Sequence, residues 1–127
     1  MDMNIKRIIC VFSLLLSTSV YAEDQLKSEE YLHNYGIAYC LSHAEHFKEE
    51  AGIAMGGYFQ LGSHNVDTAK QVEKYIAHQL KTKLDGYQAS DLQAYLMRCL
   101  EISYSKEYRE YILDALWNDA LKQLSED

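Results

Sequence analysis

Residues 69–84, AKQVEKYIAHQLKTKL, carry the clearest structural pattern in the chain. Apolar side chains recur in this stretch at steps of three and four residues, at Ala69, Val72, Ile76, Leu80 and Leu84. Because an α-helix turns once every 3.6 residues, these side chains share one face, and lysines such as Lys70 and Lys74 lie off it. The stretch therefore predicts an amphipathic helix that buries one face against the rest of the protein.

The residues that precede this stretch also favour helices. Proline is absent from all 127 residues, so the strongest helix breaker is missing. A first helix is predicted over Ser28–His46 and a second over Glu49–Leu61, which residues 62–65 end with a glycine and polar side chains. Glycine costs about 1 kcal/mol relative to alanine inside a helix. The pair Gly56 and Gly57 therefore predicts close approach of a neighbouring helix.

Two further helices are predicted after a polar break at residues 85–88. Ser90 and Gln93 have the spacing of a capping box, and Ser105 is expected to cap the last helix. The fourth helix is expected to turn inward Leu92, Tyr95, Leu96, Cys99 and Leu100. The fifth is expected to turn inward Tyr108, Ile112, Ala115, Leu116 and Leu121. Since no stretch predicts a strand, the expected fold is all-α, a small single-domain bundle of about five helices.

The N-terminus has the layout of a secretory signal peptide. A basic head at positions 6–7 precedes an apolar run at 8–16, and small residues then lead to Ala22. The apolar run is too short to anchor the chain in a bilayer. We expect cleavage after Ala22, which makes residues 1–22 the signal peptide and residues 23–127 one exported, periplasmic domain.

Two cysteines, Cys40 and Cys99, remain once the signal peptide is removed. An even pair in an oxidising compartment usually forms a disulfide. Both positions lie on predicted inward faces, so the bond would join the first helix to the fourth. It would close a loop of about 60 residues, and the chain-entropy treatment assigns such a loop about 4 kcal/mol of stability. Two buried free thiols are the alternative.

The chain is acidic, with 19 Asp and Glu residues against 12 Lys and Arg residues and a net charge of −7. Nucleic acids and anionic membranes both attract clustered lysine and arginine. We therefore expect no nucleic-acid partner and no membrane association after signal cleavage. A basic protein is the natural electrostatic complement of such a surface.

No group of side chains predicts catalysis. His43 and His46 lie one helical turn apart beside Glu49, which is a weak metal pattern that lacks the spacing of a zinc-protease helix. A solvated helix end explains the same residues. Cys40 and His43 could pair as thiol and base, but a disulfide to Cys99 would remove the thiol. We expect no enzyme, no metal and no cofactor; a metal-binding enzyme built on the two histidines is the alternative.

Tyrosine is abundant, with 11 residues in the chain, of which Tyr21 belongs to the expected signal peptide. A tyrosine ring packs like an apolar group while its hydroxyl seeks a polar partner, so tyrosine suits core edges and interfaces. Tyr87 differs from the others because it lies in the acidic, polar break of residues 85–88. An aromatic side chain in that position is a candidate to enter another protein's cleft.

Four short segments, in order along the chain, carry a family resemblance. They are NYGIAYCL at 34–41, AMGGYFQLG at 54–62, MRCLE at 97–101 and YSKEY at 104–108. Together with the signal peptide and the two cysteines, the segments between Tyr31 and Tyr108 resemble the type VI secretion amidase immunity proteins. The resemblance implies a helical, periplasmic homodimer without catalytic residues. It also implies a partner, a papain-like cysteine amidase that sibling cells inject to cut the peptide cross-bridges of peptidoglycan, whose cleft the immunity protein blocks.

By this resemblance, the effector-binding surface lies on the central helix and its flanking segments. The expected contact residues are His64, Asn65, Asp67, Lys70, Gln71, Lys74, Asp85, Gly86, Tyr87, Gln88 and Asp91. Within that set we expect the segment 85–88 to fill the cleft. The tail Arg109–Leu124, with Trp117, is longer than the family pattern and could cover or rebuild the dimer surface. A small periplasmic chaperone or stress protein is the alternative function.

Overall fold

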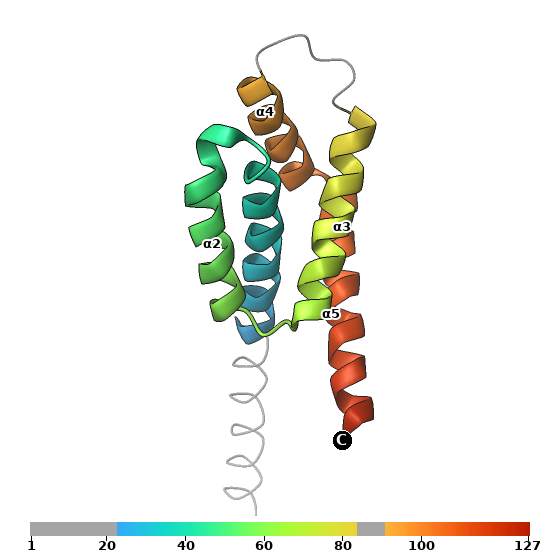
Figure 1. Ribbon diagram of the computed structural model, residues 1–127. Coiled ribbons are helices and arrows are strands. Elements are labelled where there is room, and N and C mark those ends of the chain that lie inside the picture. The colour runs from blue at the N-terminus through green and yellow to red at the C-terminus, as the bar shows by residue number, and fades with distance from the viewer. Residues whose placement is uncertain (1–22, 84–90) are drawn as a thin grey trace, which may run out of the picture.

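The computed structural model describes residues 23–83 and 91–127, excepting the side chains of residues 82, 83 and 91–94. The expected signal peptide, residues 1–22, lies outside this part of the chain. All regular structure within the described residues is helical, as Figure 1 shows. The predicted all-α fold of about five helices is confirmed.

The helices follow one another with short connections. An N-terminal helix covers residues 23–41. The elements after it are the 3-10 turn η1 (Glu45–Phe47) and the helices α2 (Lys48–Leu61), α3 (Val66–Lys83), α4 (Asp91–Tyr104) and α5 (Lys106–Glu126). In Figure 1, α2 lies alongside the N-terminal helix, and α5 runs from the end of α4 along α3.

The core lies between the N-terminal helix, α3, α4 and α5. Its buried residues are Leu32, Cys40, Val72, Ile76, Leu80, Cys99, Ile102, Tyr108, Ile112 and Ala115. The stripe predicted on α3 supplies three of them, which confirms its buried face as far as Leu80. Leu84, the last residue of the predicted stripe, lies outside the described residues. Helix α2 buries only Ala51, so it lies at the edge of the bundle.

Tyr108 occupies the centre of this core and is completely buried. Its hydroxyl donates a hydrogen bond of 2.8 Å to the carbonyl oxygen of His33. The Tyr108 ring lies 5.7 Å from the Tyr75 ring, centroid to centroid, and meets the His33 ring edge-on at 4.9 Å. Gly36 makes room for this arrangement, because a Cβ there would collide with the Tyr108 hydroxyl and lie 2.6 Å from Cγ1 of Val72.

The predicted disulfide between Cys40 and Cys99 is present. It joins the N-terminal helix to α4 across 59 residues of sequence, with the two Cα atoms 5.7 Å apart. Both cysteines are buried. The bond therefore fixes the helix that receives the Tyr108 hydroxyl against the helix that leads into α5.

The first helix differs from its predicted range of Ser28–His46. It ends at Leu41, and the chain then turns through Ser42, whose hydroxyl donates to the carbonyl oxygen of Tyr39 at 2.6 Å. The side chain thus takes a carbonyl that a longer helix would have bonded. Because neither glycine nor proline occurs at this point, the end of the helix has no strong signal in the sequence. The second helix, by contrast, agrees with its predicted bounds within one residue.

Several predicted inward positions are wrong. Leu96 and Leu100 on α4 and Leu121 on α5 are exposed, the last by 47 %. The buried face of α5 continues from Ala115 to Asp119, so Leu121 lies on the opposite side. Apolar residues lie on both sides of these helices, so the pattern alone did not select the buried one.

The predicted close approach at Gly56 and Gly57 is also wrong. No atom outside the helix's own backbone lies within 4 Å of a Cβ built at either position. The close approach occurs at Gly36 instead. At Ser105, the predicted cap of the fifth helix is confirmed, since its hydroxyl oxygen accepts from the Tyr108 amide at 3.2 Å.

Among the described residues, none of the helices combines the length and the apolar character needed to cross a bilayer.

The contrast between Gly36 and Gly56 gives a matched test of the core. Gly36→Ala should lower the free energy of unfolding by about 1–2 kcal/mol, because overpacking against Tyr108 and Val72 outweighs the gain in helix propensity. Gly56→Ala meets open space and should raise it by about 1 kcal/mol. Urea unfolding of the three proteins measures both values. Stabilisation by Gly36→Ala would contradict the proposed role of the glycine.

Candidate functional site

The outer face of α3 is a continuous exposed stripe. Asp67, Lys70, Gln71 and Lys74 are all exposed, and their spacing of three and four residues aligns them along the helix. The exposed Lys81 continues the same face. The structure thus brings four of the predicted contact residues together on one surface.

This stripe is basic although the protein is acidic. The Lys70 and Lys74 ammonium groups have no ion-pair partner in the described part of the chain. Asp67 lies 3.5 Å from the Lys122 ammonium, and both side chains are more than half exposed, so this contact contributes little stability. The net charge of the whole protein favours a basic partner. This face carries unpaired lysines, so it is complementary to acidic or polar groups on a partner.

Asn65 fixes the start of α3. Its side-chain oxygen accepts from the Thr68 amide at 2.9 Å and from the Thr68 hydroxyl at 3.1 Å. Its side-chain amide donates to Asp119 of α5 at 2.5 Å. Asn65 is thus an N-cap that also ties α3 to α5, a role that was not predicted from the sequence. The signal was present, because asparagine is among the residues preferred at a helix N-cap.

His64 is buried and only 5 % exposed. Its ring lies 5.8 Å from the Tyr35 ring and 5.3 Å from the Phe59 ring, centroid to centroid. Burial lowers the pKa of His64, and the charge of Asp119 offsets part of that shift. Neither ring nitrogen has a hydrogen-bond partner among the described residues. In this structure the ring anchors the connection between α2 and α3 and does not reach the surface.

The remaining predicted contact residues lie wholly or partly outside the described part of the chain. Asp85, Gly86, Tyr87 and Gln88 lie outside the described residues. Asp91 is the first residue of α4, and only its backbone is described.

Tyrosine side chains of the N-terminal helix and of α5 form hydrogen bonds to α3. The Tyr35 hydroxyl donates to Oε1 of Glu73 at 2.5 Å, and the Tyr111 hydroxyl donates to the backbone carbonyl of Gln71 at 3.0 Å. The Tyr75 and Tyr111 rings stack with their centroids 4.3 Å apart. Burial, followed by the hydrogen bond to Glu73, raises the pKa of Tyr35, so its hydroxyl stays protonated and able to donate. The exposed stripe therefore lies on a helix that is hydrogen-bonded to both the N-terminal helix and α5.

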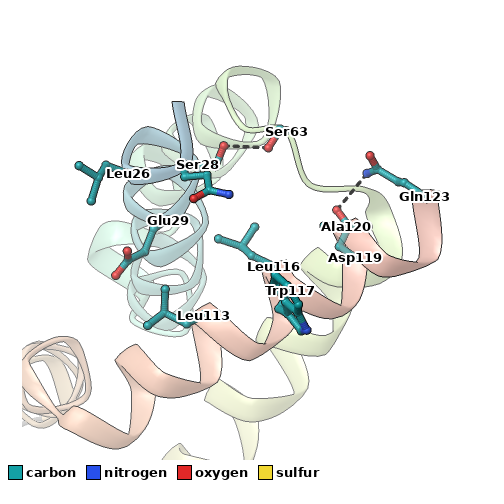
Figure 2. Close-up of a pocket in the computed structure, with 11 residues that line it drawn as sticks. Leu26, Ser28, Glu29, Ser63, Leu113, Leu116, Trp117, Asp119, Ala120 and Gln123 are labelled. Carbon is teal, nitrogen blue, oxygen red and sulfur yellow. Dashed lines mark hydrogen bonds between the residues drawn. The ribbon is translucent and has the colours of Figure 1, made fainter. Parts of the chain in front are cut away.

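A groove of about 550 Å³ lies on a different part of the surface, between α5 and the start of the N-terminal helix (Figure 2). Leu113, Leu116 and Trp117 of α5 line it, and Leu26 and Glu29 line it from the N-terminal helix. Trp117 is 64 % exposed. The tail that carries Trp117 stands out in the sequence, but the groove is not predictable from it, because the groove depends on how two helices distant in sequence meet.

His43 and His46, the two histidines considered as metal ligands, lie in different environments. Nδ1 of His43 donates to the carbonyl oxygen of Tyr39 at 2.9 Å, and its ring lies edge-on to the Tyr39 ring at 4.8 Å. His46 is exposed in η1. In the described ranges, no group of three or more His, Cys, Asp or Glu side chains is placed to hold a metal ion.

Comparison with known families identifies a match. Residues 30–112 match the family described as type VI secretion system (T6SS), amidase immunity protein (Tai4). The match includes α3, both cysteines and Tyr108, and it ends at residue 112, before the exposed apolar residues Leu113, Trp117, Leu121 and Leu124 of α5. Comparisons with curated proteins and with solved structures give no match.

The burial of His64 predicts a dependence of stability on pH. The folded-state pKa lies below the unfolded value of about 6.5, so the unfolded chain binds more protons as the pH falls. The free energy of unfolding should therefore be highest above about pH 6.5 and fall between pH 6.5 and 5. Burial lowers the pKa of His33 as well, which adds to the same trend.

Urea unfolding at several pH values measures this trend, and two variants assign it. His64→Gln should reduce the decline between pH 6.5 and 5, whereas replacement of the exposed His46 by Gln should leave it unchanged. An identical decline in His64→Gln and the parent protein would show that His64 does not contribute.

Proposed function

Because the chain belongs to the family of type VI secretion system amidase immunity proteins, we propose that it protects its cell by binding a cognate amidase effector and occluding the active-site cleft. It acts by binding and catalyses no reaction itself. The match to the family over residues 30–112, which include all of α3, carries this proposal.

We place the contact with the effector on the exposed stripe of α3 and on the segment that follows it. Asp67, Lys70, Gln71 and Lys74 offer charged and amide groups at the surface. Tyr35 and Tyr111 hold the same helix from behind, so binding requires little ordering of its backbone. In this proposal Tyr87, in the segment 85–88, enters the cleft while the α3 stripe contacts its rim.

The proposal also places the mature domain, residues 23–127, in the periplasm after cleavage behind Ala22. The disulfide between Cys40 and Cys99 supports an oxidising compartment, because such bonds rarely persist in the cytosol. The amidase is proposed to be a cysteine enzyme that acts on peptidoglycan, as the family resemblance implies.

We further propose that the protein is a homodimer. Leu113, Trp117, Leu121 and Leu124 are exposed at helical spacing on α5. Exposed apolar side chains in such a row are typical of surfaces that contact another protein chain. Light scattering on the purified protein determines the mass in solution, and a monomer at micromolar concentration would contradict this part of the proposal.

Titration of the protein into the cognate amidase, with release of peptide ends from peptidoglycan as the readout, tests the proposal. Inhibition should be complete at equimolar protein. If the amidase keeps its full activity with excess protein present, the proposed function is wrong.

Two variants test the contact surface. Tyr87→Ala should weaken inhibition about 30-fold, the loss expected for a central aromatic anchor of about 2 kcal/mol. Lys70→Glu with Lys74→Glu should weaken it about tenfold or more, because reversed charges oppose the complementary surface. Lys106→Glu is the control, since that exposed lysine lies at the start of α5. If the α3 double variant inhibits as well as the parent protein, the contact with the effector lies on another face.

A further inference from the structure

The groove of about 550 Å³ between α5 and the start of the N-terminal helix exposes large apolar side chains. In Figure 2, Leu113 and Leu116 of α5 point toward the N-terminal helix. Leu26 and Trp117 line the same groove, and they are 67 % and 64 % exposed. Large apolar side chains that gather in a groove and remain in contact with water are typical of a surface that binds another molecule.

The exposed edge of the groove favours a protein segment over a small molecule. A small molecule inside the groove would leave Leu26 and Trp117 largely in contact with water. A segment of protein chain covers both the groove and its edge. Amphipathic helices bind apolar grooves in this way, with side chains at steps of three and four residues as anchors.

The acidic charge of the protein is concentrated on the two elements that form this groove. Residues 23–30 contain four acidic residues and one basic residue, and residues 110–127 contain five acidic residues and one basic residue. Their net charges of −3 and −4 together equal the net charge of −7 of the whole chain. Residues 31–109, which include α3, contain nine acidic and eight basic residues and are nearly neutral. The complement of a basic partner is therefore this groove and not the α3 stripe.

Carboxylates at the groove have no cationic partner in the described part of the chain. Glu29 lines the groove and Asp114 is exposed on α5, and neither forms an ion pair with a described residue. Asp119 also lines the groove, and it accepts from the side-chain amides of Asn65 at 2.5 Å and Gln123 at 3.3 Å. Both donors are neutral, so the negative charge remains. A cleft with apolar walls and charges of one sign focuses the electrostatic field and attracts the opposite charge.

We propose that this groove binds a basic, amphipathic helical segment of a partner protein. The apolar side chains of the segment lie against Leu113, Leu116 and Trp117, and its lysines or arginines lie beside Glu29 and Asp114. The homodimer proposed above uses Leu113 and Trp117 as well, so the segment displaces a second copy from this face. A second copy brings the same acidic charges and is opposed by them, whereas a basic segment is attracted.

The groove is separate from the proposed contact with the amidase. Every α5 residue that lines it follows residue 112, where the family match ends. The proposal therefore does not rest on the proposed function. Binding of the basic segment and inhibition of the amidase can each fail without the other.

A synthetic peptide is the probe, and the fluorescence of Trp117 is the readout. Trp117 is the one tryptophan of the chain, so the emission of the protein reports on this groove directly. The peptide carries leucines at steps of three and four residues, lysines at the other positions and no aromatic residue. Its addition should shift the emission to shorter wavelength and reach saturation, because the ring loses contact with water. Added salt should weaken the binding.

Two control peptides separate the charge from the apolar contact. Glutamates in place of the lysines, or serines in place of the leucines, should lower the affinity about tenfold or more. Equal binding of the glutamate peptide would overturn the proposal, because the acidic residues of the groove would then play no part. An emission that the lysine peptide leaves unchanged would overturn it as well.

Matched variants test the location of the contact, and circular dichroism checks their fold. Glu29→Lys and Glu49→Lys change the net charge equally, but Glu29 lines the groove and Glu49 is exposed at the start of α2. Glu29→Lys should weaken peptide binding about tenfold, and Glu49→Lys about twofold at most. Leu113→Gln should also weaken it about tenfold, whereas Ile53→Gln, an exposed position on α2, should not. Equal effects within either pair would contradict the proposed location.

Light scattering distinguishes the segment from a second copy as the occupant. The mass of a dimer should fall to that of one protomer with one peptide as the Trp117 signal saturates, and a protein that starts as a monomer should gain the mass of one peptide. If the emission depends on protein concentration and the peptide changes neither emission nor mass, a second copy occupies the groove and the proposal is wrong.

Discussion

The fold depends on one contact, the Tyr108 ring placed against Gly36. A fully buried tyrosine needs an acceptor for its hydroxyl, and the backbone of His33 supplies it 75 residues away in sequence. Only a residue without a side chain lets the N-terminal helix come this close, because any Cβ at position 36 would strike the hydroxyl. The disulfide from Cys40 to Cys99 joins the N-terminal helix to α4 one helical turn after Gly36. Together they fix the N-terminal helix against α4 and α5.

That constraint orients α3 and thereby the surface available to a partner. Tyr75 stacks between Tyr108 and Tyr111, so the buried side of α3 is held by the residues that form the core. Lys70 and Lys74, on the opposite side of α3, are therefore exposed on a helix whose position is fixed by the core. The first part of α5 contributes to this arrangement within the family match, whereas the exposed row after residue 112 lies outside it. The exposed side chains of that row lie away from the contact between Tyr108 and Gly36.

The sequence predicted the helices, the disulfide and the buried face of α3 because these follow from local spacing and from cysteine pairing. It failed where two faces of one helix are both apolar, as at Leu96 and Leu121, since periodicity does not say which face meets the core. It also assigned the close approach to the wrong glycine, because only the tertiary contact with Tyr108 distinguishes Gly36 from Gly56. The exposed lysines of the candidate site were predictable from the helix. The burial of His64 and of Arg98 and the dual role of Asn65 were not, since each depends on residues distant in sequence.

Lysine footprinting of the free protein and of its complex with the cognate amidase determines whether the protein binds its partner through the exposed face of α3. Brief acetylation followed by peptide mass spectrometry reports the reactivity of each ammonium group. We predict that Lys70 and Lys74 lose reactivity in the complex, while Lys27 and Lys106, on the N-terminal helix and at the start of α5, keep theirs. Equal reactivity of Lys70 and Lys74 in the free protein and in a stable complex would contradict the account.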